Sequence, residues 1–444
     1  MTRISHEKIV KDAAIHNGLL DKYKGVIERL QKKYKVINGD SYSELVNFKT
    51  NKVSPRHNWF DYKQGYAEEL VKAIIKSEKP NQDYYVLDPF AGVGTTNLVA
   101  QALGYKSIGF DINPVALLAA KAKTVHYGRN EIHEIKKILA EFQPRVESQI
   151  KPEPKVIATS FTKKALSDLY KIKYFCEQLD KLNNERISNF FRIAFLSIIE
   201  DCSIRTKDGN GIKLNKKKKP IEKIFAYFKE KCLSMLRDIE QSNNDKEVKL
   251  MLGSMLMDEY NEQIKNLQVG ISIFSPPYAN CFDYCEVYKL EFWMGNFVKD
   301  YSGFKFYRDM AMRSHVNSAF DHKIKNFNKD IDIISNTIDT YNIWNKNIPD
   351  MLRGYFDDMY ELLKRMKDIF VKGSSCYIVV ANSGYKGILV PTDLLIADIA
   401  TSLGYKVEKI IIARKIRASS QQMTELHGKY NNLMRESILT IRKP

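Results

Sequence analysis

Two short strand patterns alternate with two helical patterns in the first third of the chain, and this alternation constrains the fold most. The apolar residues 84–87 lead through a glycine-rich turn into the helical pattern of residues 95–103. A second apolar run, residues 107–110, ends at Asp111 and precedes the helical pattern of residues 114–123. The order strand, helix, strand, helix is typical of a doubly wound, mostly parallel sheet. We therefore expect an α/β fold.

Further strand patterns follow late in the chain. Residues 270–274 and 376–380 are apolar and contain β-branched side chains, which favour strands. Residues 407–413 and 437–441 are also strand-like, and no helix-length apolar pattern separates them, which predicts an antiparallel pair at the sheet edge. Between the two groups of strands, long amphipathic helical patterns indicate a helical insertion; they occupy residues 163–182, 186–201 and 221–241.

The composition favours a globular protein with a polyanionic partner. A formal net charge of +17 makes nucleic acid the first candidate, although many soluble proteins are simply basic. No apolar run approaches the roughly 20 residues of a membrane span, and the start of the chain is charged where a signal peptide is apolar. We therefore expect a cytoplasmic protein without a membrane partner. The six scattered cysteines form no CxxC pair, which predicts reduced thiols and no metal site.

The glycine-rich turn carries residues suited to a nucleotide-like ligand. Asp88 ends a strand, and Gly92 and Gly94 lie in the turn that opens the next helix. Glycines let the backbone approach a ligand, and free N–H groups at a helix start hold polar or anionic groups. Asp111 ends the following strand, where a carboxylate can accept hydrogen bonds from two ribose hydroxyls.

A second motif follows the strand at residues 270–274. Ser275, Pro276, Pro277 and Tyr278 lie at the carboxyl end of that strand, where open α/β sheets bind ligands. The hydroxyl of Ser275 and the carbonyl of Pro276 can accept the two hydrogens of an exocyclic base amine, while the prolines fix the backbone. Tyr278 offers a ring on which a base rotated out of a duplex can stack. A tight turn after a strand is the plain structural alternative.

The string Asp-Pro-Phe-x-Gly-x-Gly-Thr-Thr at residues 88–96 resembles the S-adenosylmethionine motif of the DNA amino-methyltransferases, which methylate N4 of cytosine or N6 of adenine. Asp111 is similar to the second acidic motif of that family, and residues 275–278 resemble its catalytic motif. The resemblance implies a Rossmann-like methyltransferase fold and S-adenosylmethionine as cofactor. It implies Asp88, Phe90, Ala91, Gly92, Gly94, Thr95, Thr96, Asp111, Trp59 and Phe60 as cofactor-binding residues, and Ser275, Pro276, Pro277 and Tyr278 as catalytic residues.

The resemblance leaves two points open on the cofactor side. Trp59 and Phe60 lie in the segment that the family closes over the methionine part of the cofactor, where an aromatic face attracts the sulfonium. The same two side chains can instead attach the amino-terminal helices to the sheet. A Gly-Asp pair that helps to bind adenine in relatives is replaced here by Gly253-Ser254, so we do not expect an acidic adenine ligand there.

The first residue of the catalytic motif favours one target base. Ser occurs there chiefly in N4-cytosine members and Asp or Asn chiefly in N6-adenine members, so we expect transfer to N4 of cytosine in a short duplex target by base flipping and in-line transfer. An N6-adenine enzyme, an RNA base methyltransferase and a non-catalytic nucleic-acid-binding protein remain alternatives. Double-stranded DNA is the expected substrate. The enzyme can be solitary or can have a cognate restriction endonuclease as its partner, and the sequence does not indicate which. The sequence indicates neither the recognition sequence nor the oligomeric state.

Two basic stretches compete for DNA contacts. The insertion at residues 130–248 holds Arg205, Lys207, Lys216 and Lys217 in what reads as a flexible polar loop, and such lysines can contact phosphates. The segment at residues 296–350 holds Arg308 and Arg313 among aromatic residues. A solvated loop is the plain alternative for the first stretch and a lid over the cofactor for the second.

These patterns predict four regions. They are a helical lead-in at residues 1–55, a cofactor-binding half at 56–129, the helical insertion at 130–248 and a catalytic half at 249–444, which includes the segment at 296–350. We expect the turn at Gly92 and the turn at Pro276 to face each other, because methyl transfer needs the donor and the amine in line.

Overall fold

The computed structural model describes residues 6–144, 154–208, 211–241, 245–318, 323–416, 430 and 433–444, with the backbone alone for residues 6–15 and Asp40. The chain divides into two compact units, and each is described by itself. The terminal unit comprises Met1–Glu44, Met255–Phe282 and Ala311–Pro444. The central unit comprises Leu45–Ser254 and Asp283–Met310. The fold is mixed α/β with mostly parallel strands, as predicted.

The central unit contains three parallel strands in the order β2 (Tyr85–Asp88), β3 (Ser107–Asp111) and β6 (Val248–Leu252). Asp111 lies opposite Leu252 in the register of β3 and β6. The helices α3 (Thr95–Ala102) and α4 (Pro114–Thr124) follow β2 and β3, which confirms the predicted alternation. The strand β6 was not predicted, because the Lys, Leu and Met in its sequence Val-Lys-Leu-Met-Leu favour a helix as much as a strand.

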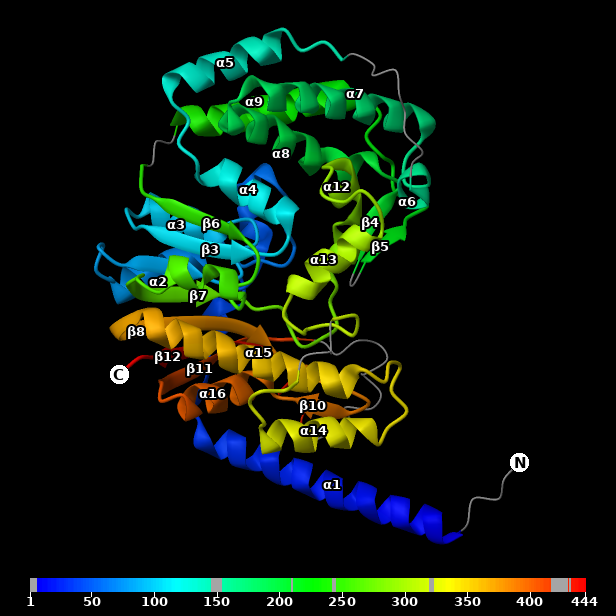
Figure 1. Ribbon diagram of the computed structural model, residues 1–444, viewed down its shortest axis with the longest axis vertical. Helices are drawn as coiled ribbons and strands as arrows, with labels where there is room; N and C mark the ends of the chain where they lie inside the picture. Colours follow the sequence, from blue (N-terminus) through cyan, green and yellow to red (C-terminus); the bar gives the residue numbers. More distant parts are fainter. Residues whose placement is uncertain are drawn as a thin grey trace. The chain divides into compact units, whose positions relative to one another are not determined.

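A layer of helices packs on α4 in the same unit. Figure 1 shows α7, α8 and α9 side by side, with α8 against α4 and α5 against α9. The layer and its connections comprise α5 (Arg129–Ala140), α6 (Lys155–Ala158), α7 (Lys163–Leu179), α8 (Glu185–Cys202), α9 (Ile224–Gln241), α11 (Tyr284–Val287), α12 (Lys289–Met294) and α13 (Ser302–Met310), whereas α2 (Glu68–Glu78) packs on α3. The apolar faces of these helices are buried, which explains their predicted amphipathic patterns.

The segment between α8 and α9 differs from the prediction. It was expected to be a flexible polar loop, but it forms an antiparallel hairpin of β4 (Arg205–Asp208) and β5 (Gly211–Leu214). Gly209 and Asn210 lie outside the described residues. The polar composition concealed the strands, because only Lys207 of β4 turns its side chain into the protein.

The main sheet of the terminal unit contains, among the described residues, the strands β1 (Val36–Asn38), β11 (Lys406–Lys415), β12 (Arg435–Arg442), β8 (Phe370–Ala381) and β7 (Val269–Phe274), in that order. The short strands β9 (Ser383–Tyr385) and β10 (Ile388–Val390) pair in a separate antiparallel hairpin. The strand β12 runs antiparallel to both of its neighbours, and the pairs β1–β11 and β7–β8 are parallel. The predicted antiparallel pairing of residues 407–413 with residues 437–441 is confirmed. The strand β1 extends the sheet beyond β11 and was not predicted.

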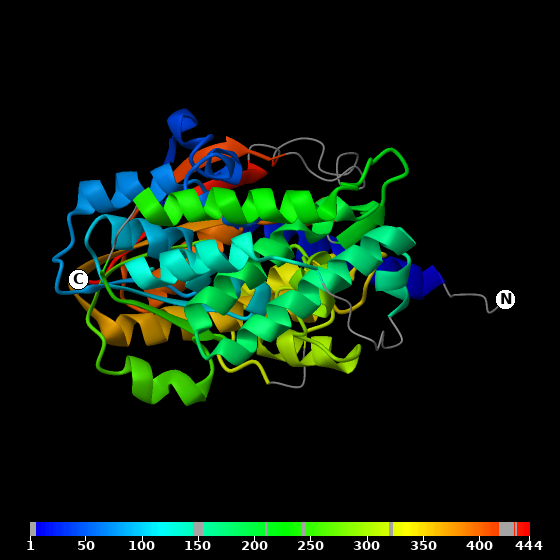
Figure 2. The same cartoon turned by 90° about the horizontal axis from the view of Figure 1, so that it is seen from above.

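The helices of the terminal unit are α1 (His6–Lys33), α10 (Asn261–Ile264), α14 (Lys329–Asp339), α15 (Ile348–Ile369) and α16 (Thr392–Ser402). In Figures 1 and 2, α1 lies along α14, and α14 packs on α15. The predicted helical lead-in is helical only as far as Lys33, because the chain then turns into β1 and short 3-10 turns. Within the described part of the chain, no helix combines the length and the apolar character needed to cross a bilayer.

Candidate active site

The glycine turn of the central unit has the backbone geometry that the sequence requires. Gly92 and Gly94 have φ angles of +51° and +76°, a region that other L residues rarely adopt. A side chain at Gly92 would lie 2.9 Å from the ring of Tyr62, and one at Gly94 would lie 2.8 Å from Ala120 Cβ. The turn therefore brings its backbone close to both neighbours, and Gly94 caps the start of α3.

Asp88 supports this turn from inside. Its side chain is buried, and its two carboxylate oxygens accept hydrogen bonds from the Phe90 N–H at 3.0 Å and the Tyr66 hydroxyl at 3.1 Å. The Tyr66 hydroxyl also lies 2.5 Å from Thr96 Oγ1. Burial raises the pKa of Asp88 to about 7. Asp88 and Thr96 thus fix the shape of the turn, and Tyr66 is a residue of this site that the sequence analysis missed.

Asp111 is placed to meet a ligand. Its carboxylate accepts hydrogen bonds from the N–H groups of Gly92 and Asn113, both at 2.7 Å. Unlike Asp88, it is partly exposed at the carboxyl end of β3. Burial of its carboxylate raises its pKa to about 6. An oriented carboxylate with unused lone pairs fits the ribose hydroxyls of S-adenosylmethionine, and the glycine turn beside it fits the close approach of that cofactor.

The aromatic segment before α2 corrects one expectation. Trp59 is fully buried, donates its indole N–H to Asp238 at 2.8 Å and packs edge-on against Phe190 of α8. Phe60 is buried as well. Both rings lie in the core of the central unit, which favours a packing role for them over contact with a sulfonium. Tyr62, which was not predicted, is the aromatic residue that covers Gly92.

A second ring supports Tyr62 in this position. The two rings of Tyr62 and Tyr288 are stacked, with centroids 5.5 Å apart and an angle of 17° between their planes. The Tyr288 hydroxyl donates to Gln64 Oε1 at 2.6 Å. This bond links Tyr288, which lies between α11 and α12, to the segment that contains Tyr62. Tyr288 is thus a buried residue of the central unit, and its stacked ring holds Tyr62 over the glycine turn.

The loop after β7 is held in a fixed shape in the terminal unit. Ser275 follows the buried strand and is itself only partly buried. Tyr385 donates its hydroxyl hydrogen to the carbonyl of Ala279 at 2.7 Å, and the Cys281 N–H donates to the carbonyl of Ser314 at 3.1 Å. These bonds, together with the ring constraints of Pro276 and Pro277, fix the path of the backbone around Ser275.

Side chains of this loop continue into a hydrogen-bonded chain. The Ser275 hydroxyl donates to the Tyr278 hydroxyl oxygen at 3.3 Å, and the Tyr278 hydroxyl donates to Glu436 Oε1 at 2.5 Å. The other oxygen of Glu436 accepts from Arg414 Nε. Neither Glu436 nor Arg414 was predicted as a site residue from the sequence. The sequence signal for Glu436 is its place at the start of the predicted antiparallel strand. Such a strand begins at the edge of the sheet where the parallel strands end, so a charged residue there lies near the catalytic motif.

Two of the residues predicted to contact DNA are buried in ion pairs. Lys207 Nζ lies 2.5 Å from Glu291 Oε1 and 3.4 Å from Glu200 Oε2. Burial acts to lower the pKa of Lys207, but the charges of the two glutamates outweigh it and raise the pKa. Arg313 is buried against Asp357 and Asp358. Both charges are already paired with carboxylates inside the protein, which argues against contact of these two side chains with phosphates.

The other predicted basic residues differ in their exposure. Arg308 pairs with Asp283 and Glu286, and its side chain is 20% exposed to solvent. Arg205 donates to the hydroxyls of Ser160 and Thr159. Lys216 and Lys217 are exposed beyond β5. Of the six residues, these two lysines are the ones that the structure leaves most accessible to a phosphate.

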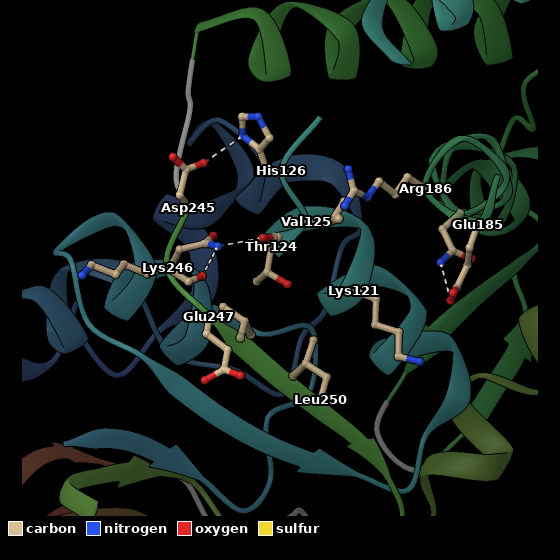
Figure 3. Close-up of a pocket in the computed structure, with 13 residues that line it drawn as sticks. Lys121, Thr124, Val125, His126, Glu185, Arg186, Asp245, Lys246, Glu247 and Leu250 are labelled. Carbon is tan, nitrogen blue, oxygen red and sulfur yellow. Dashed lines mark hydrogen bonds and ion pairs between the residues drawn. The ribbon is translucent and has the colours of Figure 1, made fainter. Parts of the chain in front are cut away.

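A separate cavity of about 580 Å³ lies in the central unit (Figure 3). It is lined by residues 245–248 at the start of β6, by the end of α4 around Thr124, and by the start of α8 at Glu185 and Arg186. Its acidic and basic side chains are mixed; Arg186 pairs with Glu131 at 2.9 Å. The glycine turn and Asp111 lie instead at the carboxyl ends of β2 and β3. None of the described residues that line this cavity belongs to the predicted site.

Similarity to known proteins covers both units. Residues 10–122 match a family model described as DNA methylase. The Type II methyltransferase M.BsoBI of Geobacillus stearothermophilus is 28% identical over 94% of this chain and 92% of its own length. M.AvaI of Anabaena variabilis, also a Type II methyltransferase, is 23% identical over 90% of this chain and 89% of its own length. M.MjaII of Methanocaldococcus jannaschii is 28% identical over 32% of this chain and 28% of its own length.

Proposed function

From the premise that the chain belongs to the DNA amino-methyltransferase family and is a Type II DNA methyltransferase, we propose that it methylates N4 of cytosine in a short duplex target. The single observation that carries the choice of base is Ser275, a hydroxyl where N6-adenine members chiefly carry a carboxamide or carboxylate. The same proposal names double-stranded DNA as the substrate and a cognate restriction endonuclease as the partner.

The chemistry requires two acceptors at the amine. The lone pair of an exocyclic amine is delocalised into the base ring, so the nitrogen becomes nucleophilic when its hydrogens are held out of the plane. The Ser275 hydroxyl and the Pro276 carbonyl are the acceptors that we assign to this role. Ser275 is only partly buried at the end of β7, as contact with a base that has left the duplex requires.

The central unit would hold the cofactor. When bound, S-adenosylmethionine supplies a methyl group on a positively charged sulfur. We assign Asp111 to the ribose hydroxyls and the backbone of Gly92 and Gly94 to close approach, because Asp111 is partly exposed and already oriented by two N–H groups. Tyr62 replaces Trp59 as the aromatic residue that we place beside the cofactor, since it covers Gly92.

The turns at Gly92 and Pro276 belong to different units, so the expectation that they face each other stays a prediction. Transfer requires this arrangement, because the donor carbon and the amine nitrogen must lie in line. Turnover by the intact chain, with loss on substitution in either turn, is the functional test of that expectation.

Product analysis tests the choice of base. The purified chain is incubated with S-adenosylmethionine carrying a labelled methyl group and with duplex DNA or RNA, and the nucleosides are separated after digestion. We expect labelled N4-methylcytosine from duplex DNA. Labelled N6-methyladenine would overturn the cytosine assignment, and label in RNA alone would overturn the assignment of DNA as the substrate.

Substitution tests the catalytic assignment. We expect Ser275→Ala to lower kcat about 100-fold, because one acceptor at the amine is lost, and to leave binding of S-adenosylmethionine near normal. Ser402→Ala, at an exposed serine that ends α16, is the matched control and should retain full turnover. Isothermal titration and single-turnover rates measure the two quantities. Full turnover by Ser275→Ala would remove Ser275 from the mechanism.

A further inference from the structure

We propose that Glu436 is a positioning residue that acts through Tyr278 and makes the Ser275 hydroxyl a hydrogen-bond acceptor toward the substrate amine. The inference rests on the proposed function and deepens it, because it assigns a source of specificity for amino groups to a residue outside the sequence motif. All of the groups involved lie in the terminal unit.

The topology places Glu436 at the catalytic edge of the sheet. The strands β7 and β8 are parallel, and β12 runs antiparallel to β8. The first residues of β12 therefore lie at the edge where β7 and β8 end. Glu436 pairs in register with Ala381, the last residue of β8. A sequence separation of 158 residues between Tyr278 and Glu436 is closed by strand pairing alone.

The chain of hydrogen bonds has a direction because its end is an acceptor. An ionised carboxylate has no hydrogen to give, so the Tyr278 hydroxyl donates its hydrogen to Glu436, at 2.5 Å. The oxygen of Tyr278 then accepts the hydrogen of Ser275, at 3.3 Å. Ser275 has a single hydrogen, which is used in this bond. The lone pairs of Ser275 remain and can accept only from a donor such as an amine.

Burial and charge make Glu436 suited to this role. Glu436 is 4% exposed, so water does not compete for its oxygens. A buried carboxylate needs a compensating charge, and Arg414 on the neighbouring strand supplies it through Nε. Each carboxylate oxygen therefore has a charged or hydroxyl donor: Arg414 on one side and Tyr278 on the other.

This polarity discriminates between bases. Cytosine presents an amino group at position 4, and thymine presents a carbonyl at the same position. A serine hydroxyl that only accepts can bind the amine but leaves two acceptors facing each other when the base carries a carbonyl. Without a fixed polarity, the serine hydroxyl rotates and can donate, which lowers both the discrimination and the polarisation of the amine.

The test combines two variants and their double variant in the intact chain. Glu436→Gln keeps the shape but adds an N–H donor, and Tyr278→Phe keeps the stacking ring but removes the hydroxyl. We expect each to lower kcat at least tenfold on duplex DNA, with the KM for S-adenosylmethionine unchanged. We expect the double variant to be no slower than the slower single variant, because both changes break the same chain.

The matched control is Glu408→Gln. Glu408 pairs with Arg442 across the same two strands, β11 and β12, at 2.9 Å, but it is not part of the hydrogen-bonded chain of Ser275. We expect Glu408→Gln to retain wild-type kcat. A thermal unfolding curve accompanies each variant. If Glu436→Gln is destabilised, Tyr278→Phe still tests the chain, because it leaves the pair of Glu436 and Arg414 in place.

Three results would overturn the inference. They are wild-type kcat in Glu436→Gln, wild-type kcat in Tyr278→Phe, or an equal further loss when Glu436→Gln is added to Tyr278→Phe, which would show that Glu436 acts apart from the hydroxyl. Failure of the proposed function looks different. In that case the wild-type chain itself produces no N4-methylcytosine; if it methylates adenine instead, the same variants are compared on that amine and decide the inference in the same way.

Discussion

At the scale of single residues, Asp111 determines how cofactor binding depends on pH. Burial raises its pKa to about 6, so the group is a carboxylate above that pH and a neutral acid below it. Only the carboxylate accepts hydrogen bonds from both ribose hydroxyls. We expect the Kd for S-adenosylmethionine to be constant above pH 6 and to rise up to about tenfold for each unit below it.

Titration calorimetry between pH 5 and pH 8 measures this dependence, with Asp111→Asn as the control. The variant should bind more weakly at pH 7 and lose the rise below pH 6. The carboxylate of Asp88, whose pKa is raised to about 7, is directed to Phe90 and Tyr66 and remains in the variant. A pH dependence that survives unchanged in Asp111→Asn would assign it to Asp88 or to the ligand.

At Gly94, both the backbone conformation and the packing require glycine. Its φ is +76°, and an added Cβ would meet Ala120 Cβ at 2.8 Å. We expect Gly94→Ala to lower the free energy of unfolding by about 1–3 kcal/mol, through strain and overlap. Gly25→Ala is the matched control, because Gly25 lies in α1 with no atom within 4 Å of the added Cβ. Helix propensity predicts a gain of about 0.5–1 kcal/mol there, and urea unfolding measures both.

At the scale of elements, the hairpin β4–β5 depends on one buried charge. The side chains of Lys207 on β4 and Glu291 on α12 are only 6% and 2% exposed to solvent. Lys207→Met leaves Glu291 buried without its partner, so we expect a loss of about 3–5 kcal/mol in the free energy of unfolding. Lys207→Met with Glu291→Met should recover most of this loss. Urea unfolding gives both values, and a loss below about 1 kcal/mol in the single variant would contradict the assignment.

Elements whose identity is local were predictable from the sequence, and residues whose partners are distant were not. The alternation of β2, α3, β3 and α4 and the turn at Gly92 follow from apolar periodicity and glycine chemistry within 40 residues or so. The hydrogen bond of Trp59 to Asp238 was not predictable, because the two residues are 179 positions apart. The same holds for Lys207 and its partner Glu291, which are 84 positions apart. The sequence shows where a basic or aromatic residue stands. It does not show which distant carboxylate forms an ion pair or a hydrogen bond with that residue.

In the candidate site, too, the residues that belong to a local pattern were predicted and the residue placed by a distant strand pairing was not. Asp111, Gly92 and Ser275 were predicted because each ends a strand or forms the turn after it. Glu436 was not, because its place beside Tyr278 arises only when β12 pairs antiparallel with β8. The short strands β1 and β6 were missed too, since each is completed by pairing with a strand far along the chain.

At the scale of the whole molecule, the net charge of +17 should appear in the salt dependence of DNA binding. Each phosphate that a lysine contacts adds about 0.9 to the slope of log K against log salt. Lys207 and Arg313 are buried in ion pairs, so neither side chain faces DNA, but the carboxylates that pair with them are counted in the same net charge and leave it undiminished. Lys216 and Lys217 are exposed. Of the residues predicted to bind DNA, they are therefore the ones with which to test contact with phosphates.

We expect Lys216→Ala with Lys217→Ala to lower the salt slope by about 2 and to weaken binding equally for target and non-target duplexes, because phosphates carry no sequence information. Lys22→Ala, an exposed lysine of α1, is the control for a change in net charge alone. Its slope should match the wild-type value, since a distributed charge acts weakly beyond the Debye length of about 8 Å at physiological salt. Fluorescence anisotropy between 50 and 200 mM salt gives the slopes. If the double variant kept the wild-type slope, the lysines after β5 would be a solvated surface, and phosphate contacts would have to come from other exposed cations.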